Sequence, residues 1–153
     1  IEHSLREIEV LALELHPPLV LEAATTVAGV IQEMRNHYLG YALITVDNRL
    51  AGIFTERDVF LSVLGNDAVL DEPVFEHMTP DPVCVGTKDP IRKVVLLMHQ
   101  CGHRQIPITD TDGHIAGCVR HKEIAEYMVN HFAKHVLNLP PDPEQIAQAP
   151  EGG

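Results

Sequence analysis

Residues 41–60, YALITVDNRLAGIFTERDVF, decide the fold of this chain. Two short hydrophobic runs flank Asp47-Asn48, a pair that is typical of the tight turn in a β-hairpin. The stretch ends in Thr55-Glu-Arg-Asp58, where a hydroxyl, a guanidinium and a carboxylate follow one another as a helix begins. The sequence therefore predicts a hairpin that brings three polar side chains to a strand-to-helix corner.

A second copy of this pattern follows about 64 residues later. Residues 27–34 carry apolar side chains at the i, i+3, i+4 and i+7 spacing of an amphipathic helix, and residues 91–98 repeat it. A Pro-led apolar stretch precedes each helix, at 18–21 and 82–85, and a second hairpin pattern lies at 106–119. The predicted unit is strand, helix, strand, strand, helix, present twice.

The repeat predicts an α/β fold in five segments. A helix ends each copy, from Glu56 to about Leu64 and from Lys122 to about Phe132. Ser4 and Glu7 have the spacing of a capping box, which predicts a helix over Ser4–Leu15. The expected segments are an N-terminal helix (1–16), a first unit (17–66), a linker (67–79), a second unit (80–135) and a Pro- and Gly-rich, disordered tail (136–153).

Composition and charge limit the possible functions. The 153-residue chain is 45% hydrophobic, enough for a core, and has 22 acidic and 11 basic residues, a formal net charge of -11. This acidic balance argues against binding nucleic acid by neutralising its phosphates. No apolar run approaches the roughly 20 residues that span a bilayer. Three cysteines without close pairing suit a reducing compartment, so we expect a soluble, cytoplasmic protein.

The corner at Thr55–Asp58 has two interpretations. The start of a helix favours an anion, so a Thr55 hydroxyl and an Arg57 guanidinium there suit a phosphate. A carboxylate one turn on, Asp58, suits two neighbouring hydroxyls, and together these groups match a ribonucleotide. In the local alternative, Thr55 caps the helix while Arg57 and Asp58 are solvated residues of its first turn. The corner alone leaves both open.

The double unit resembles a tandem pair of CBS domains, the regulatory module named after cystathionine β-synthase. The resemblance rests on Gly52–Asp58 (GIFTERD), on the Met-Thr-Pro segment Met78–Val83, and on the strand entry Gly102–Pro107 (GHRQIP). The order and double occurrence of the motifs make the match specific, and it covers about residues 17–132. It implies two pseudo-symmetric units with two clefts for adenosine-type ligands.

The first implied cleft faces the Thr55–Asp58 corner. By the resemblance, Thr55 and Arg57 contact a phosphate and Asp58 accepts the ribose hydroxyls, while Arg104 either assists with the phosphate or lies on the rim. Backbone groups at the strand ends read the adenine edge. The residues implied around the adenine are Thr79, Val83, Cys84, His103, Arg104, Gln105, Ile106 and Pro107.

The second copy departs from the pattern, with Arg120 and Glu123 in place of Thr55 and Asp58. The longer Glu side chain shifts the carboxylate, and Arg120 intrudes where a small hydroxyl leaves room. We therefore expect an empty or weaker cleft, or one that holds a different anion such as a polyphosphate. The residues implied to face it are Leu19, Gly40, Tyr41 and Ala42, of which Tyr41 offers a ring for stacking on a base.

Ten histidines raise the question of a metal site. His99 and His103, like His131 and His135, are four residues apart, as two ligands on one helix face would be. Gly102 is expected to end the first of these helices, and the sequence has no CxxC or HExxH pattern. We predict no metal and no required cofactor. Without a nucleophile beside a positioned base, we also predict no catalytic residues.

These expectations favour a regulatory module over an enzyme. An adenine nucleotide (AMP, ADP or ATP) or S-adenosylmethionine is expected to bind the first cleft and to change the output of a partner protein or domain outside this chain. The second helix of each unit offers a surface for pairing with another copy of the chain, so we predict a homodimer. Two alternatives stay open, a constitutive dimerisation scaffold without ligand and a metal-responsive protein.

Overall fold

The computed structural model describes residues 8–136, and its first half forms a four-stranded sheet. The sheet contains β1 (Val20–Glu22), β2 (Tyr41–Val46), β3 (Arg49–Thr55) and β4 (Thr79–Pro80), in that spatial order. β1 is parallel to β2, whereas β2/β3 and β3/β4 are antiparallel. Helices α2 (Val27–Asn36) and α3 (Glu56–Ser62) complete this first unit.

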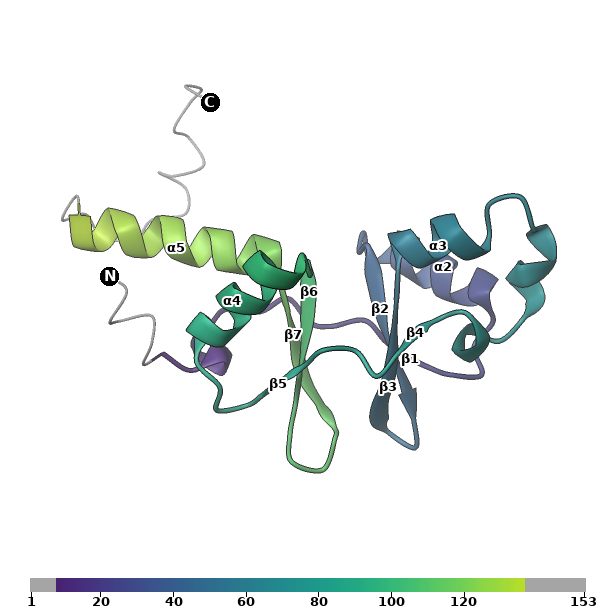
Figure 1. The fold of residues 1–153 in the computed structure, drawn as a ribbon, viewed down its shortest axis with the longest axis horizontal. Helices are drawn as coiled ribbons and strands as arrows, with labels where there is room; N and C mark the ends of the chain where they lie inside the picture. Colours follow the sequence, from purple (N-terminus) through teal and green to yellow (C-terminus); the bar gives the residue numbers. More distant parts are fainter. Residues whose placement is uncertain (1–7, 137–153) are drawn as a thin grey trace, which may run out of the picture.

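The second unit repeats this plan with a three-stranded sheet. Its elements are β5 (Val85–Gly86), α4 (Ile91–Cys101), β6 (Gln105–Thr109), β7 (Ile115–Arg120) and α5 (His121–Val136). β5/β6 are parallel and β6/β7 antiparallel. Figure 1 shows the first unit at one end of the molecule and the second at the other. The predicted α/β class and the repeated unit are confirmed.

Both hairpins turn where the sequence predicts. Asp47 and Asn48 have φ angles of +51° and +63°, the left-handed pair that a two-residue hairpin loop requires. In the longer β6–β7 turn, Oδ1 of Asp110 accepts the N–H groups of Asp112 (2.9 Å) and His114 (3.0 Å). These turns set the registers that bring polar residues to the ends of β3 and β7.

Two hydrophobic clusters form the core. The first joins α2 to its sheet through residues such as Val27, Val30 and Phe54, each 0% exposed, and it also includes Cys118 of β7. The second joins α4 to β6 and β7 around Ile91 and other fully buried side chains. Burying one such side chain stabilises the fold by roughly 1.5–3 kcal/mol. Because Cys118 belongs to the first cluster, the two units share part of their core.

The helix predicted over Ser4–Leu15 is wrong in its described part. Residues 8–15 contain only the 3₁₀ turn η1 (Val10–Ala12). Val10 (0% exposed) and Leu13 (7%) pack into the second cluster, and this packing outweighs the propensity of a short helix. The capping box at Ser4 and the predicted tail beyond residue 136 lie outside the described residues.

The predicted linker contributes to the core. It contains two 3₁₀ turns, η2 (Asp67–Asp71) and η3 (Val74–Glu76), and then enters β4. Val69 (4% exposed) and Val74 (0%) are buried in the first cluster. The N–H of Val74 donates to the carbonyl of Thr25 (2.8 Å). The segment is therefore attached to the start of α2.

The second helices differ in length from the prediction. α3 ends at Ser62 rather than near Leu64, and α5 continues past Phe132 to Val136.

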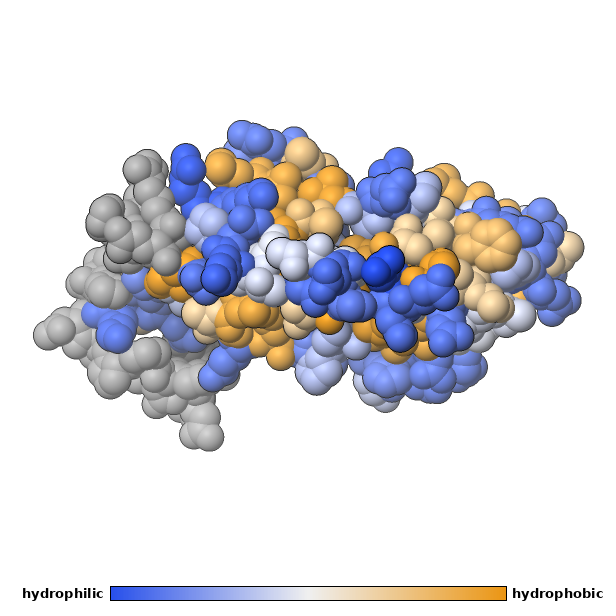
Figure 2. Space-filling model, turned by 90° about the horizontal axis from the view of Figure 1, so that it is seen from below, coloured by the Kyte–Doolittle hydropathy of each residue, from blue (hydrophilic) through white to orange (hydrophobic). Residues whose placement is uncertain are grey.

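No helix within residues 8–136 is long and apolar enough to cross a bilayer. The face drawn in Figure 2 mixes hydrophobic and hydrophilic residues along its length.

Candidate ligand-binding site

A cleft of about 690 Å³ lies between the two units, within the size range of small-molecule sites. Its walls come from the β3–α3 corner, from β4 with the segment after it, and from the turn that enters β6. It brings together eight of the eleven residues predicted for the first cleft: Thr55, Arg57, Asp58, Thr79, Val83, His103, Arg104 and Gln105.

The structure does not bring the other three predicted residues to the cleft wall. Ile106 is 0% exposed and belongs to the second cluster, and Pro107 is buried in the middle of β6. Side chains alternate along a strand, so Gln105 can line the cleft while Ile106 points into the core. Cys84 is exposed just before β5, where its Sγ accepts the hydroxyl of Thr109 (3.7 Å).

Sequence reasoning missed part of the wall. Leu61 lies one helical turn after Arg57, so helical spacing could have found it. Asp81 lies inside the Met-Thr-Pro motif and could have been read from it. Gly40 was predicted for the second cleft, yet it lines the first, where the Glu56 side chain occupies the space that a Cβ at position 40 would need. The missed residues are Gly40, Ile53, Glu56, Leu61, Asp81, Pro82 and Gly102.

Asp58 connects two walls of the cleft. Its Oδ2 accepts the N–H (2.9 Å) and the hydroxyl (3.1 Å) of Thr55, and its Oδ1 accepts the hydroxyl of Thr79 (3.1 Å). The bonds to Thr55 are those of a helix cap, as in the local interpretation of the corner. The bond to Thr79 is different, because it joins α3 to β4 across 21 residues of chain.

This arrangement defines what Asp58 can accept. A carboxylate has about four acceptor positions, and the Thr55 and Thr79 bonds use three of them. A ligand with two vicinal hydroxyls can use the remaining position and replace the Thr79 hydroxyl. The Thr55 hydroxyl donates to Asp58, so it contacts a phosphate only after rotating away.

The corner of the second unit has the same backbone plan and a different chemistry. The N–H of Arg120 donates to Oε1 of Glu123 (3.3 Å), and its Nε donates to both carboxylate oxygens (3.1 and 2.8 Å). The Glu123 side chain is 4% exposed and that of Arg120 22%. The hydrogen bond to Glu123 raises the pKa of Arg120. An ion pair therefore occupies this corner.

Tyr41 lies near this ion pair and is 1% exposed. Burial, and then the neighbouring Cys118, raise the pKa of the Tyr41 phenol, and burial raises the pKa of the Cys118 thiol to about 12. The expected stacking of Tyr41 on a base is wrong in this conformation, because the ring belongs to the first cluster. Leu19 (6% exposed) and Ala42 (0%) are buried there too. That the second cleft is empty or weaker stays a prediction.

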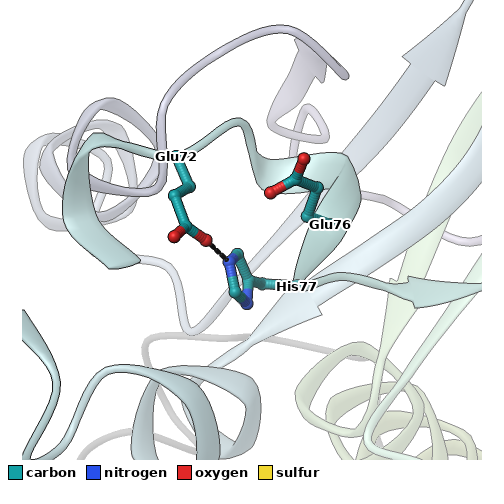
Figure 3. A group of neighbouring side chains, drawn as sticks. All are labelled: Glu72, Glu76 and His77. Atoms are coloured by element: carbon teal, nitrogen blue, oxygen red, sulfur yellow. Dashed lines mark hydrogen bonds and ion pairs between the residues drawn. The ribbon is translucent and has the colours of Figure 1, made fainter. Parts of the chain in front are cut away.

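The linker holds a separate polar group, Glu72, Glu76 and His77 (Figure 3), whose potential metal-ligating atoms lie within 4.8 Å of one another. Nε2 of His77 and Oε2 of Glu72 are 2.5 Å apart. Their hydrogen bond joins the end of η2 to the residues that lead into β4.

The histidine pairs considered from the sequence lie elsewhere. Gly102, at φ +72°, ends α4 before His103, so His99 and His103 do not share a helix. His131 stacks on Tyr127 with ring centroids 5.7 Å apart, and the side chain of His135 lies outside the described residues. The absence of a resident metal stays a prediction.

Comparison with known proteins identifies the family. The CBS domain model matches residues 10–65 and 74–130. The chain belongs to the CBS domain family. An uncharacterized 17.7 kDa protein in the bps2 3′ region of Acidianus ambivalens is 31% identical over 113 residues, 72% of this chain and 67% of that protein. Five CBS domain-containing proteins of Arabidopsis thaliana also match, but this chain spans only 16–19% of their length.

Solved CBS structures have the same fold. A CBS domain protein from Pyrobaculum aerophilum, complexed with AMP, has a TM-score of 0.68 at 22% identity, over 76% of this chain and 89% of that one. The CBS domain pair of protein MJ0100, in complex with 5′-methylthioadenosine and S-adenosyl-L-methionine, has a TM-score of 0.71 at 18% identity, over 80% and 97%. At these identities the likeness establishes the CBS-pair fold alone.

Proposed function

We propose that this CBS pair is a ligand-sensing regulatory module that binds an adenosine-containing nucleotide in the cleft between its units. The carrying observation is that Asp58, Arg57 and Arg104 line one cleft with walls from both units. A carboxylate acceptor beside two guanidiniums is the set that ribose hydroxyls and a phosphate require. The AMP of the Pyrobaculum aerophilum complex and the adenosyl ligands of the MJ0100 complex support the same ligand class.

The ribose and phosphate lie beside Asp58, Arg57 and Arg104. The ribose hydroxyls donate to Asp58, one of them in place of the Thr79 hydroxyl. Arg57 approaches the phosphate from α3 and Arg104 approaches it from the entry to β6. Thr55 adds a hydrogen bond once its hydroxyl turns from Asp58. Charge-assisted bonds of this kind are about twice as strong as neutral ones.

The base lies against the aliphatic residues of the segment after β4. Val83, 41% exposed, and the neighbouring Pro82 offer aliphatic surface for one face of the adenine. His103 and Gln105, at the entry to β6, lie at its edge, where backbone and side-chain groups can hydrogen-bond. The apolar wall supplies affinity and the edge contacts supply recognition.

The module signals through the relative position of its units, because the ligand contacts both. We expect the two units to exchange between two relative positions. A ligand shifts this equilibrium only by the difference between its affinities for the two positions. Beyond the ligand residues, α3 exposes Phe60 (65%) beside a groove shared with α2, and α5 exposes Phe132 (53%). Apolar helix faces of this kind favour association, and we assign them to a homodimer. Helix α3 then contacts the ligand through Arg57 and Asp58 and the partner copy through Phe60.

Binding takes place without turnover, and the regulated partner is a protein or domain outside these residues. The described cysteines are unpaired, which supports a place in the reducing cytoplasm. A constitutive scaffold is the second candidate function. The capping bonds from Thr55 to Asp58 favour it, because they stabilise the corner without any ligand.

Thermal unfolding with and without AMP, ATP, S-adenosylmethionine, Zn²⁺ and EDTA tests the proposal. A ligand at about a hundredfold excess over its Kd adds about 2.7 kcal/mol, roughly 5–10 °C of midpoint for a chain of this size. We expect an adenosyl ligand to give this shift, Asp58→Ala to lose it, and Glu126→Ala, on the exposed face of α5, to keep it. A scaffold responds to none of the additions, and a metal-responsive protein responds to Zn²⁺ and EDTA.

A further inference from the structure

The charges around the cleft discriminate among adenosyl ligands. Two guanidiniums, Arg57 and Arg104, share its walls with three carboxylates, Glu56, Asp58 and Asp81. His103 adds a positive charge only when it is protonated. With neutral His103 the lining side chains sum to one negative charge, in a chain whose formal net charge is -11. The cleft is therefore not a general polyanion site.

The backbone fixes the two carboxylates that the ribose does not use. The N–H of Glu56 donates to the carbonyl of Gly40 (3.1 Å), and the Glu56 side chain lies against that glycine. Asp81 is in the left-handed region at φ +46°, where its N–H donates to the carbonyl of Ala51 (3.1 Å). Few residues other than Gly, Asn and Asp adopt this conformation readily. The main chain therefore fixes the positions of Glu56 and Asp81 at the cleft wall.

The two guanidiniums limit how much phosphate the cleft can neutralise. A phosphate monoester carries a charge of about -1.5 to -2 at pH 7, which matches in size the two positive charges of Arg57 and Arg104 and leaves none for the carboxylates Glu56, Asp58 and Asp81. A second or third phosphate adds negative charge beside Glu56 and Asp81, and among the residues that line the cleft only His103 is left to offset it. Like charges a few ångström apart repel even across solvent.

We propose that the cleft selects a nucleoside monophosphate, the class of AMP, over nucleoside di- and triphosphates. This selectivity rests on the proposed function, since it takes the ribose to lie at Asp58. A triphosphate brings charge that the walls do not neutralise. Adenosine lacks the phosphate that pairs with Arg57 and Arg104.

Isothermal titration of the ligand-stripped chain with AMP, ADP, ATP, adenosine and S-adenosylmethionine tests the order of affinities. EDTA is present throughout so that no divalent cation screens the phosphates. We expect AMP to bind more tightly than ATP and adenosine, each of which is weaker by about tenfold or more. ATP or adenosine binding as tightly as AMP overturns the selectivity and leaves the proposed function intact. Absence of binding by every ligand overturns both.

Two charge-removing variants test the cause of the selectivity. Glu56→Gln and Asp81→Asn keep the side-chain shape and remove one negative charge each. We expect either variant to raise the affinity for ATP relative to AMP by roughly three- to tenfold. Asp112→Asn, in the exposed β6–β7 turn, is the matched control and leaves that ratio unchanged. An identical ratio in wild type and in both cleft variants contradicts the charge account.

Discussion

The two strand-to-helix corners share a backbone and differ in what their carboxylates hold. Both helices begin with an N–H bond to the facing loop, from Glu56 to Gly40 (3.1 Å) and from His121 to Arg104 (2.8 Å). Asp58 lies at an open cleft, and its hydrogen-bond donors within residues 8–136 are all neutral. Glu123, with a side chain 4% exposed, accepts the guanidinium of Arg120.

This difference indicates how a duplicated unit divides its tasks. An acceptor whose partners are hydroxyls can exchange them for those of a ligand, because the bonds lost and gained are similar. An acceptor committed to a largely buried cation cannot, because separating the pair leaves an uncompensated charge. The Thr55–Asp58 corner is thus suited to binding, and the Arg120–Glu123 corner to holding the fold together.

The largest expected effect of a single change is at the second corner. Glu123→Ala leaves the Arg120 guanidinium without its partner in a mostly buried place. We expect a loss of about 3 kcal/mol in the free energy of unfolding, measured by urea denaturation. Asp58→Ala, the equivalent change at the first corner, loses its capping bonds and the bond from Thr79, about 2 kcal/mol together, and leaves no buried charge behind. Equal losses for the two variants would remove the distinction between the corners.

A smaller effect separates the glycines that precede the two corners. A Cβ at Gly52 would overlap the side chain of Met78, whereas one at Gly117 meets Cδ1 of Leu15 at 3.2 Å. Gly52→Ala should lower the free energy of unfolding by about 1–3 kcal/mol through overpacking, and Gly117→Ala by less. The reverse order in denaturation experiments would show that the first unit is packed more loosely than the structure indicates.

The smallest expected effect is a pH dependence of stability that differs between the starts of α2 and α4. The hydroxyl of Thr26 accepts the Gly29 N–H (3.1 Å) at α2, with no charge involved. Before α4, the N–H of Gly86 and then Lys93 lower the pKa of Asp89. A pKa that is lowered in the folded state stabilises the fold above the unfolded value of about 4. This contribution is lost as the pH falls through the folded pKa.

Asp89→Asn should therefore be less stable than wild type at pH 7, and the difference should shrink as the pH falls toward 3. Thr26→Ala is the control, with a loss that stays constant over the same range. Urea denaturation at several pH values measures both. A pH-independent difference for Asp89→Asn would contradict the assignment.

Local patterns predict the frame of this fold and not its long-range contacts. Helices α2 and α4 begin at Val27 and Ile91, the first residues of the two apolar patterns, because 3.6-residue periodicity is a property of adjacent turns. The N-terminal segment has the local pattern of a helix but does not form one within its described residues. Its conformation is set by the burial of Val10 and Leu13 in the second cluster.

In the candidate site, too, the sequence predicts the local motifs but not the contacts between distant residues. Its corner, Thr55 to Asp58, follows from a short motif, and so does the entry to β6. The Asp58–Thr79 bond joins residues 21 positions apart, and the contact of Glu56 with Gly40 crosses from α3 to the start of β2. No local pattern encodes either contact. In the second unit the Arg120–Glu123 ion pair stands where the first unit has Thr55 and Asp58. The substitutions are visible in the sequence, but that Nε of Arg120 bonds both carboxylate oxygens is visible only in the structure.

The number of AMP sites per chain decides which of the two corners binds the nucleotide. We predict one site per chain in isothermal titration, weakened at least about tenfold (1.4 kcal/mol) by Asp58→Ala and retained by Arg120→Ala in protein shown to be folded. Two sites per chain, or one site that depends on Arg120 and tolerates Asp58→Ala, would contradict the assignment of binding to the first corner.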